Sequence, residues 1–471
     1  MIFGSPLFVF LFLPLFLIAY YALPLRFRSY WILGASCLFY AWWRLDFLIL
    51  LLGMSLATYL LGRRVAENLP RKRRRARAAA AAGVLLNLSI LAYFKYFDFG
   101  IANLNAVLAL LGLRSVTAWR VLLPVGISFY SFQAIGYLVD VYRGESSPAS
   151  CFLDLALYLV LFPKLLAGPI LRYRDFASQL KRRTHTFEAW SEGAGRFMTG
   201  LCKKVLIADL AAKLADAVFA LQRPSFADAW LGALAYTVQI YFDFSGYSDM
   251  AIGLGRLMGF RFVENFNLPY LSRSIGEFWR RWHISLSSWL RDYLYIPLGG
   301  SRRGPLRTYV NLFLVMLLGG LWHGAAWTFA AWGAWHGALL ALERWLRSRR
   351  PQRPFAFGIP PTLLFVVLGW VLFRSPSFGA ALRLYYGMIG GNGFGISAAL
   401  GWQISASALT ASAAGFLLIY GAPLAGRLQE LFGDGRRRLA ESLRLAILPL
   451  FLLSLLKLTA ESYTPFLYFR F

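Results

Sequence analysis

Long apolar stretches decide what this chain can fold into. A helix needs about 20 apolar residues to cross about 30 Å of hydrocarbon, and stretches of this character follow one another from end to end. They lie at 5–24, 30–43, 46–62, 78–97, 121–142, 152–170, 230–256, 308–330, 331–346, 361–374, 408–426 and 443–460. No stretch between them is long enough for an independent soluble domain, and no period of 20 to 50 residues repeats. We therefore predict an all-α polytopic integral membrane protein, a single domain over 1–471 with roughly 11–12 membrane helices.

Composition and charge agree with a membrane protein. The hydrophobic fraction is 58%, above the roughly 45–50% of soluble domains. The formal net charge of +27 would suggest nucleic acid in a soluble protein, but basic cytoplasmic loops facing anionic lipid headgroups explain it better here. We expect the lipid bilayer as a partner and no nucleic acid. Cys37, Cys151 and Cys202 lie far apart with no CxxC pair, so neither a disulfide framework nor a zinc ribbon is expected.

The clusters of Lys and Arg set the orientation. The densest, 71–77, follows the third stretch and should be cytoplasmic, which puts the N-terminus outside, as a retained first span. The basic loop 172–183 should also be cytoplasmic, yet an odd number of crossings separates the two. Either 99–113 enters the membrane, or the proline-broken stretch 152–170 is re-entrant. Backbone that leaves the helix at membrane depth must line a cavity or be covered by protein, so we expect re-entrant or interfacial segments around a central hole.

Histidines are scarce and clustered. Of four, His283, His323 and His336 fall within 54 residues, while His185 lies in a polar basic loop. Ionisable groups inside a membrane are costly and mark functional sites by default. His323 comes about fifteen residues into a helix that starts near 308, roughly 22 Å from the cytoplasmic face. We expect it inside the bilayer, in the outer half.

Two similar motifs surround His323 and His336. The sequences are GLWHG, which includes Trp322, and GAWHG thirteen residues later. Glycines four apart allow close approach of another helix or of a substrate. On one continuous helix the two histidines would point about 140° apart, so they share a site only if the chain turns between them. Otherwise both motifs only pack helices.

Other polar groups lie in apolar surroundings. His283 falls in 278–300, where interleaved tryptophans, tyrosines and arginines suit a helix at the membrane interface, and it could simply face headgroups. Asp243 and Asp249 belong to a polar island, 241–249. At membrane depth their carboxylates must be paired with other polar groups or hydrated. They could bond Arg280, Arg281 or Arg291, line a cavity, or form a buried ion-pair brace.

The histidines suggest acyl transfer. A desolvated imidazole stays neutral near pH 7 and can take a proton from an alcohol, which then attacks an acyl carbonyl. The chain has no GxSxG, HExxH, P-loop or GxGxxG motif, which argues against a serine hydrolase, a zincin, an ATPase and a dinucleotide enzyme. No histidine pair has the i, i+3 or i, i+4 spacing of a zinc site, so we expect no metal.

Three segments carry a family resemblance: FDFSGYSDMAIGLGRLMGF, NFNLPYLSRSIGEFWRRWHISLSSWLRDYLYIPLGG and LLGGLWHGAAWTFAAWGAWHG. With SPLFVFLFLPLFLIAYY, FYAWW, VGISFYSFQAIGYLVDVYRG and TPFLYFRF, they resemble the membrane-bound O-acyltransferase family, and specifically its alginate O-acetyltransferase-like bacterial branch. The resemblance runs over nearly the whole chain. It is weak only at 350–365 and 385–405.

The resemblance implies a function and a site. Helices surround a central tunnel, the family's invariant histidine matches His323, and a second polar position matches His283. A thioester donor, acetyl-CoA or an acyl-carrier protein, acts on the cytoplasmic side as co-substrate, with no bound cofactor. The acetyl group passes to a cell-surface polysaccharide, commonly with a periplasmic acetyltransferase partner, at the bacterial inner membrane. The resemblance assigns no role to Asp243, Asp249 or Arg291, and we take these three, with Trp322 and His336, only as candidate residues lining the tunnel.

The sequence is also compatible with other functions. Within the family they are peptidoglycan O-acetylation, acetylation of cellulose or other exopolysaccharides, and D-alanyl transfer to teichoic acid. From another class comes a proton-coupled transporter, in which the histidines and aspartates relay protons. That reading predicts inverted internal repeats, which the sequence does not display.

Overall fold

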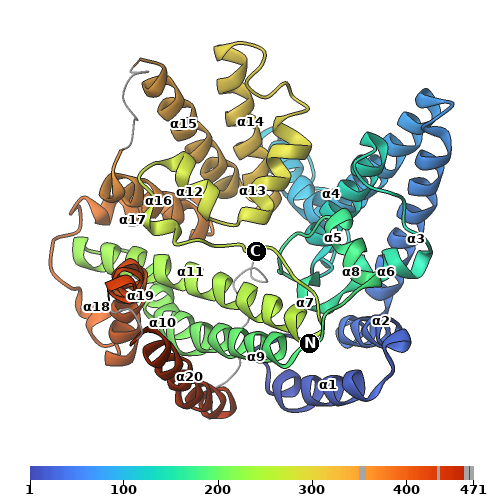
Figure 1. Ribbon diagram of the computed structural model, residues 1–471. Helices are drawn as coiled ribbons and strands as arrows, with labels where there is room; N and C mark the ends of the chain where they lie inside the picture. Colours follow the sequence, from blue (N-terminus) through green and yellow to red (C-terminus); the bar gives the residue numbers. More distant parts are fainter. Residues whose placement is uncertain (350–356, 432–434, 461–465, 467–471) are drawn as a thin grey trace. The chain divides into compact units, whose positions relative to one another are not determined.

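The computed structural model describes residues 1–349, 357–431, 435–460 and 466. These residues are almost entirely helical and contain no strand, as the apolar stretches predict (Figure 1). Two compact units emerge from the contacts: unit 1 comprises Met1–Gly193 and Leu254–Val263, and unit 2 comprises Ala194–Gly253 and Glu264–Phe471. The expectation of one domain over 1–471 stays a prediction.

Unit 1 is built from the first eight α-helices, the start of a ninth and the last four residues of α11. Their bounds are η1 Phe8–Phe12, α1 Leu13–Ala22, α2 Leu25–Ala41, α3 Leu45–Asn68, α4 Arg73–Leu110, α5 Ile127–Arg143, α6 Phe152–Val160, α7 Phe162–Leu165, α8 Tyr173–Lys181 and α9 Phe187–Cys202.

Unit 2 holds the remaining elements. Their bounds are η2 Lys203–Ala208, α10 Asp209–Ala220, α11 Phe226–Leu257, η3 Pro269–Leu271, α12 Ile275–Arg281, α13 Ile284–Leu290, η4 Arg291–Tyr295, α14 Pro305–His323, α15 Trp327–Arg349, α16 Ile359–Arg374, α17 Phe378–Met388, α18 Ala398–Gly401, α19 Ala406–Leu431 and α20 Gly435–Ala460.

Several helices have the length and apolar character of membrane spans. Among the described residues four qualify fully, Leu45–Asn68, Arg73–Leu110, Pro305–His323 and Ala406–Pro423, and shorter apolar helices occur at Phe8–Ala22, Ile359–Arg374 and Ala446–Ala460. With 38 residues, α4 extends about 57 Å. Most of 99–113 is therefore a continuation of α4, which ends at Leu110.

The stretch 152–170 is not one continuous helix. It divides at Leu161 into α6 and α7, of nine and four residues. Nine residues rise only about 14 Å, too little to cross the hydrocarbon. Pro163 occupies the first turn of α7, where its missing N–H is tolerated. The break predicted from the prolines is confirmed, and it favours the re-entrant alternative.

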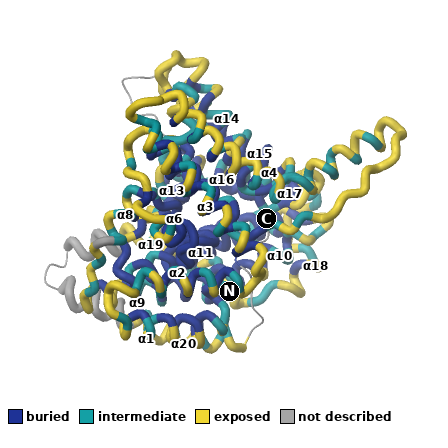
Figure 2. The backbone as a smooth tube through the Cα atoms, turned by 90° about the vertical axis from the view of Figure 1, so that its right-hand side faces the viewer, coloured by how far each residue is buried: buried dark blue, intermediate teal, exposed yellow. Residues whose placement is uncertain are grey.

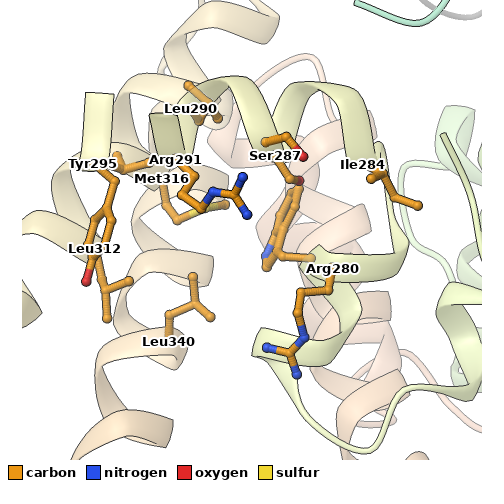
Figure 3. A pocket seen from close by; sticks show the side chains of 12 residues that line it. Arg280, Ile284, Ser287, Leu290, Arg291, Tyr295, Leu312, Met316 and Leu340 are labelled. Carbon is orange, nitrogen blue, oxygen red and sulfur yellow. The ribbon is translucent and has the colours of Figure 1, made fainter. Parts of the chain in front are cut away.

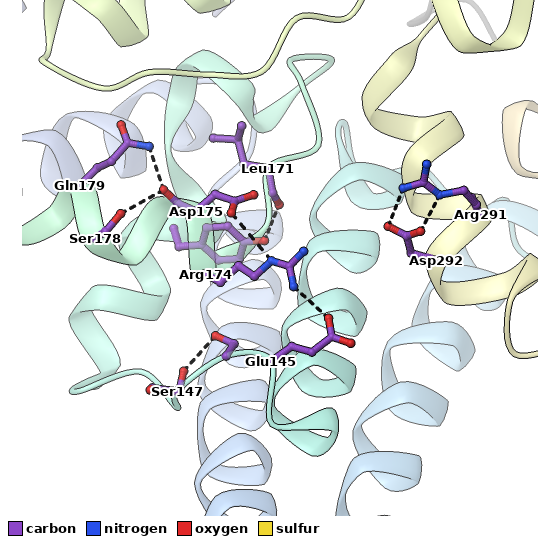
Figure 4. A network of polar contacts seen from close by, with 11 residues as sticks. Glu145, Ser147, Leu171, Arg174, Asp175, Ser178, Gln179, Arg291 and Asp292 are labelled. Carbon is purple, nitrogen blue, oxygen red and sulfur yellow. Dashed lines mark hydrogen bonds and ion pairs between the residues drawn. The ribbon is translucent and has the colours of Figure 1, made fainter. Parts of the chain in front are cut away.

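A polar network ties the loops of unit 1 together (Figure 4). Arg174 on α8 pairs with Glu145, which follows α5, at 2.9 Å, and with Asp175 at 3.8 Å. Beyond α8, His185 Nε2 lies 2.9 Å from the Tyr20 hydroxyl, which donates to the Met258 carbonyl. Burial lowers the pKa of His185, and the charges of Arg28 and Arg183 lower it further.

In unit 2, α14 and α15 form a tight antiparallel pair joined by a short turn at 324–326 (Figure 1). The stretches predicted at 308–330 and 331–346 are therefore wrong at this junction, because the first helix ends at His323 and the second begins at Trp327. Glycines bring the two backbones together: a methyl group on Gly320 would lie 2.9 Å from the Gly333 Cα, and one on Gly337 would lie 2.9 Å from the Phe313 Cα. The close approach predicted from the repeated glycines is confirmed.

Helix α11 forms the interior of unit 2. It is buried over most of its 32 residues (Figure 2), including Asp243 and Asp249 of the predicted polar island.

Candidate active site

His323 lies at the end of α14, where the chain turns, and three aromatic rings surround it. Its ring centroid lies 4.9 Å from that of Trp322, 5.2 Å from that of Trp332 and 5.2 Å from that of Phe373, and all three rings are steeply inclined to the imidazole. Trp332 comes from α15 and Phe373 from α16. The imidazole is thus fixed by rings from three helices.

His323 differs from the other two clustered histidines in access. His283 and His336 are both 0% exposed, whereas His323 is only partly buried. A group that exchanges protons with a substrate must be reachable by it. Of the three, His323 therefore meets this requirement best.

His283 contacts Trp322, one of the rings around His323, and so belongs to the same cluster of histidines and aromatic rings. Its ring lies 6.4 Å from Trp322 and 4.7 Å from Phe244 on α11. It immediately precedes α13, with φ 42° and ψ 54°, a left-handed conformation that costs a non-glycine residue roughly 1–3 kcal/mol. Such a conformation persists only where surrounding contacts impose it.

His336 completes the cluster from α15. Its ring lies 5.1 Å from Trp332 and 5.2 Å from Trp279, and is stacked 6.3 Å from Phe278. Among the described residues neither ring nitrogen has a hydrogen-bond partner. Because the chain turns after His323, the condition under which His323 and His336 can share a site is met, and the Trp332 ring contacts both.

The two aspartates of the polar island are paired in a buried ion-pair brace, one of the arrangements predicted for them. Asp249 binds Arg196 at 2.7 Å and Lys203 at 2.6 Å, instead of an arginine from 280–291. Asp243 lies 2.7 Å from Lys204, which also binds Asp209 at 2.7 Å. The cations come from α9 and η2, upstream in the chain. The predicted ion-pair brace is therefore confirmed, and the possible arginine partners 280, 281 and 291 are wrong for Asp249.

A cavity of about 470 Å³ lies among α12, α13, η4, α14 and α15 (Figure 3). Its walls are mainly apolar, and its positive charge comes from Arg280 and Arg291. Arg291 pairs with the neighbouring Asp292 at 2.7 Å. The lining residues are Trp279, Arg280, Ile284, Ser287, Ser288, Leu290, Arg291, Tyr295, Leu312, Val315, Met316 and Leu340.

Trp279 links this cavity to the histidines. Besides lining the cavity, its ring lies 5.7 Å from Trp332, which in turn contacts His323. An apolar chamber with guanidinium groups and a nearby reachable imidazole suits a ligand that combines an apolar or flexible arm with negative charge. In the described part of the chain no group of three or more His, Cys, Asp or Glu side chains could hold a metal ion.

The sequence predicted the histidines but missed other members of the cluster. Phe373 lies fifty residues beyond His323 in an apolar helix, and no local pattern distinguishes it from other core phenylalanines. Trp332 and Trp279 stand in the segments already singled out, beside the histidines themselves, and their aromatic character was the available signal.

Sequence comparisons identify the relatives of this chain. Residues 21–378 match the membrane-bound O-acyltransferase family, MBOAT. The chain is 49% identical to a probable alginate O-acetylase of Pseudomonas putida and 46% identical to that of Pseudomonas aeruginosa, covering 100% of each protein and of itself. It is also 38% identical to a peptidoglycan O-acetyltransferase of Helicobacter pylori, over 83% of this chain and 80% of the relative.

A more distant relative is a teichoic acid D-alanyltransferase of Bacillus subtilis, 28% identical over 54% of this chain and 69% of the relative. The family match over residues 21–378 includes His283, His323 and His336, and the family is one of membrane-bound O-acyltransferases. The chain therefore belongs to the membrane-bound O-acyltransferase family.

Proposed function

We propose that this O-acyltransferase moves an acetyl group from a thioester donor on the cytoplasmic side to a hydroxyl of an extracytoplasmic polysaccharide, directly or through a periplasmic acetyltransferase. His323 is its catalytic histidine. The names of the full-length relatives, at 46–49% identity, support acetyl transfer to a polysaccharide. In this proposal the protein resides in the bacterial inner membrane with its N-terminus in the periplasm.

The observation that carries the proposal is the contrast between the three histidines. His323 is partly accessible at a helix end, while His283 and His336 are sealed inside the protein. Rings of Trp322, Trp332 and Phe373 hold the accessible imidazole in place. This arrangement suits a general base that meets an incoming hydroxyl.

The reaction balances with one histidine. A ring nitrogen of neutral His323 accepts the proton of the acceptor hydroxyl, whose oxygen bonds to the thioester carbonyl carbon. The tetrahedral intermediate collapses, the carbon–sulfur bond breaks, and the leaving thiolate takes the proton back from the imidazolium. The products are the ester and a free thiol, and the histidine returns to its neutral form.

His283 has a supporting role in this proposal. Its ring contacts Trp322, which also contacts His323, so it helps to fix that side of the site. The cavity beside Trp279 suits the arm of the donor, because its apolar walls accept a flexible chain and Arg280 and Arg291 can bind phosphate.

Acetyl transfer by purified protein in lipid nanodiscs tests the proposal. Labelled acetyl-CoA and an acetylated carrier protein are supplied in parallel, with a hydroxylated acceptor sugar. We expect His323→Ala to lose about 10²-fold or more of the rate, while His185→Gln, a histidine substitution in unit 1, retains it. A folded His323→Ala protein with the wild-type rate would overturn the assignment.

The acceptor is identified by mass analysis of the surface polysaccharide from cells with and without the intact protein. We expect acetyl esters to disappear from one polysaccharide when His323 is replaced by alanine. Loss of acetyl groups from peptidoglycan, or of D-alanine from teichoic acid, would instead point to the activity named for the more distant relatives.

A further inference from the structure

A second cavity opens where α14 begins and α15 ends. It has a volume of about 400 Å³, and its polar lining consists of Ser301, Thr308, Tyr309, Arg344, Arg347 and Ser348. Within the described chain, none of the residues that line it carries a carboxylate. Because α14 has 19 residues and ends at His323, this cavity lies roughly 27 Å along the helix from the candidate active site.

The cavity is positively charged. Arg347 is partly neutralised by Glu343, which lies 2.7 Å away, whereas among the described residues the exposed Arg344 forms no ion pair. The two segments that form the cavity, 301–309 and 344–349, contain no Asp or Glu, and their arginines are Arg302, Arg303, Arg307, Arg344, Arg347 and Arg349. Positive charge concentrated in this way attracts an anion, and guanidinium groups bind phosphate through paired hydrogen bonds.

Exposed apolar side chains stand next to the cavity-lining residues on both helices. On α14, Leu306 is 77% and Val310 is 39% exposed, and on α15 Leu342 and Trp345 are each 42% exposed. Helix α14 is long and apolar enough to cross a membrane. A free phosphate would leave these apolar side chains uncovered. A ligand with an anionic head and an apolar tail satisfies both the guanidinium groups and the apolar surface.

We propose that this cavity binds the headgroup of an anionic phospholipid. Arg344 and Arg347 hold the phosphate, the neighbouring hydroxyls donate hydrogen bonds to it, and the acyl chains lie against the exposed apolar side chains of α14 and α15. Basic pockets between membrane helices bind such headgroups. Because the start of α14 and the end of α15 share the cavity, the bound lipid stabilises the helix pair that carries His323 and Trp332. The inference goes beyond acyl transfer and does not depend on it.

Binding of phosphatidylglycerol to the purified full-length protein in detergent, measured by native mass spectrometry, tests the site. Arg344→Gln removes a charge that no carboxylate of the described chain neutralises. We expect its affinity for phosphatidylglycerol to fall about fivefold, the contribution of one arginine near an anionic lipid surface. If Arg344→Gln does not fold, Tyr309→Phe takes its place. Loss of that hydroxyl should weaken binding about twofold or more, and an unchanged affinity would contradict the site.

Arg302→Gln is the matched control. It removes the same charge from an exposed side chain near the cavity that does not line it. We expect its affinity for phosphatidylglycerol to stay near that of the wild type. Equal losses of affinity in Arg344→Gln and Arg302→Gln would show general attraction to a basic surface and overturn the proposed site.

Three other ligands identify the source of the phosphate. Phosphatidylcholine carries a phosphate but no net negative charge, so we expect it to bind much more weakly. Inorganic phosphate and acetyl-CoA have no diacyl tail and should not displace phosphatidylglycerol. Equal binding of the two lipids, or displacement by inorganic phosphate, would overturn the inference. Displacement by acetyl-CoA, with a raised KM for the donor in Arg344→Gln, would assign the cavity to the acyl donor instead.

Melting temperatures give a second readout of the same site. A ligand that binds only the folded protein raises its stability, so phosphatidylglycerol added to phosphatidylcholine nanodiscs should raise the melting temperature of the wild type more than that of Arg344→Gln. An equal rise would contradict the inference. Neither measurement requires turnover, so a protein that transfers no acyl group still tests the lipid site, and loss of the lipid site leaves the proposed function standing.

Discussion

Replacing Gly320 by alanine should reduce activity by separating α14 from α15. The added methyl group would lie 2.9 Å from the Gly333 Cα and 3.0 Å from its nitrogen, and nearer still to the Phe329 carbonyl. These neighbours are backbone atoms of the facing helix, so no side chain can rotate away. Ordinary contact begins at 3.4 Å, and the helices must therefore move apart by about 0.5 Å or more.

The displacement acts directly on the site. His323 lies one helical turn beyond Gly320, and the Trp332 ring against it neighbours Gly333. Overpacking of this kind costs about 1–3 kcal/mol of stability, and a misplacement approaching 1 Å can cost about 10²-fold in rate. We expect Gly320→Ala to remain folded with a lowered melting temperature and to lose about tenfold to 10²-fold of kcat.

Gly319→Ala supplies the matched control. Its methyl group would meet only the flexible end of Leu290, at 3.3 Å, so activity and melting temperature should stay near wild type. The assay is acetyl transfer by purified protein, paired with thermal unfolding in the same detergent. Equal activity and stability for the two alanine variants would refute the claim that backbone contact at these glycines positions His323.

Three further outcomes follow from the structure. Lys204→Met removes the cation that binds both Asp209 and the buried Asp243 and should cost about 3–5 kcal/mol of unfolding free energy; an unchanged denaturant midpoint would contradict this. Burial lowers the pKa of His185 below its ordinary 6.5, so below pH 6.5 the unfolded chain binds more protons than the folded one and stability should fall as the pH drops. In melting experiments, His185→Gln should weaken this dependence of the melting temperature on pH. His336→Phe keeps the ring packing and should retain kcat within about tenfold, and a loss as large as that of His323→Ala would show a chemical role.

The sequence was most informative where length and periodicity control the outcome. Apolar stretches long enough to span a membrane became helices, and the prolines of 152–170 marked a real break. The repeated glycines around His323 and His336 predicted close helix packing, and the turn after His323 allowed both histidines to contact Trp332. Helix length, proline breaks and glycine spacing depend on residues close together in the chain, so each can be predicted from one segment of the sequence.

Features that join distant segments were harder to predict. Phe373 reaches His323 from another helix, and the cations of Asp243 and Asp249 lie on α9 and η2 rather than on the arginine-rich segment 280–291. Each basic side chain could satisfy an aspartate equally well on charge alone. Which one does so depends on how α9 and η2 pack beside α11, where Gly200 and Gly246 approach each other closely.

The central claim is that His323 performs the proton transfer of acyl transfer, and the rate of acetyl transfer by purified His323→Ala protein tests it most directly. The variant is compared with wild type in nanodiscs, with matched melting temperatures to establish that both are folded. The account predicts a rate reduced by about 10²-fold or more, with the donor thioester left uncleaved. A folded variant that transfers acetyl groups at the wild-type rate would contradict it.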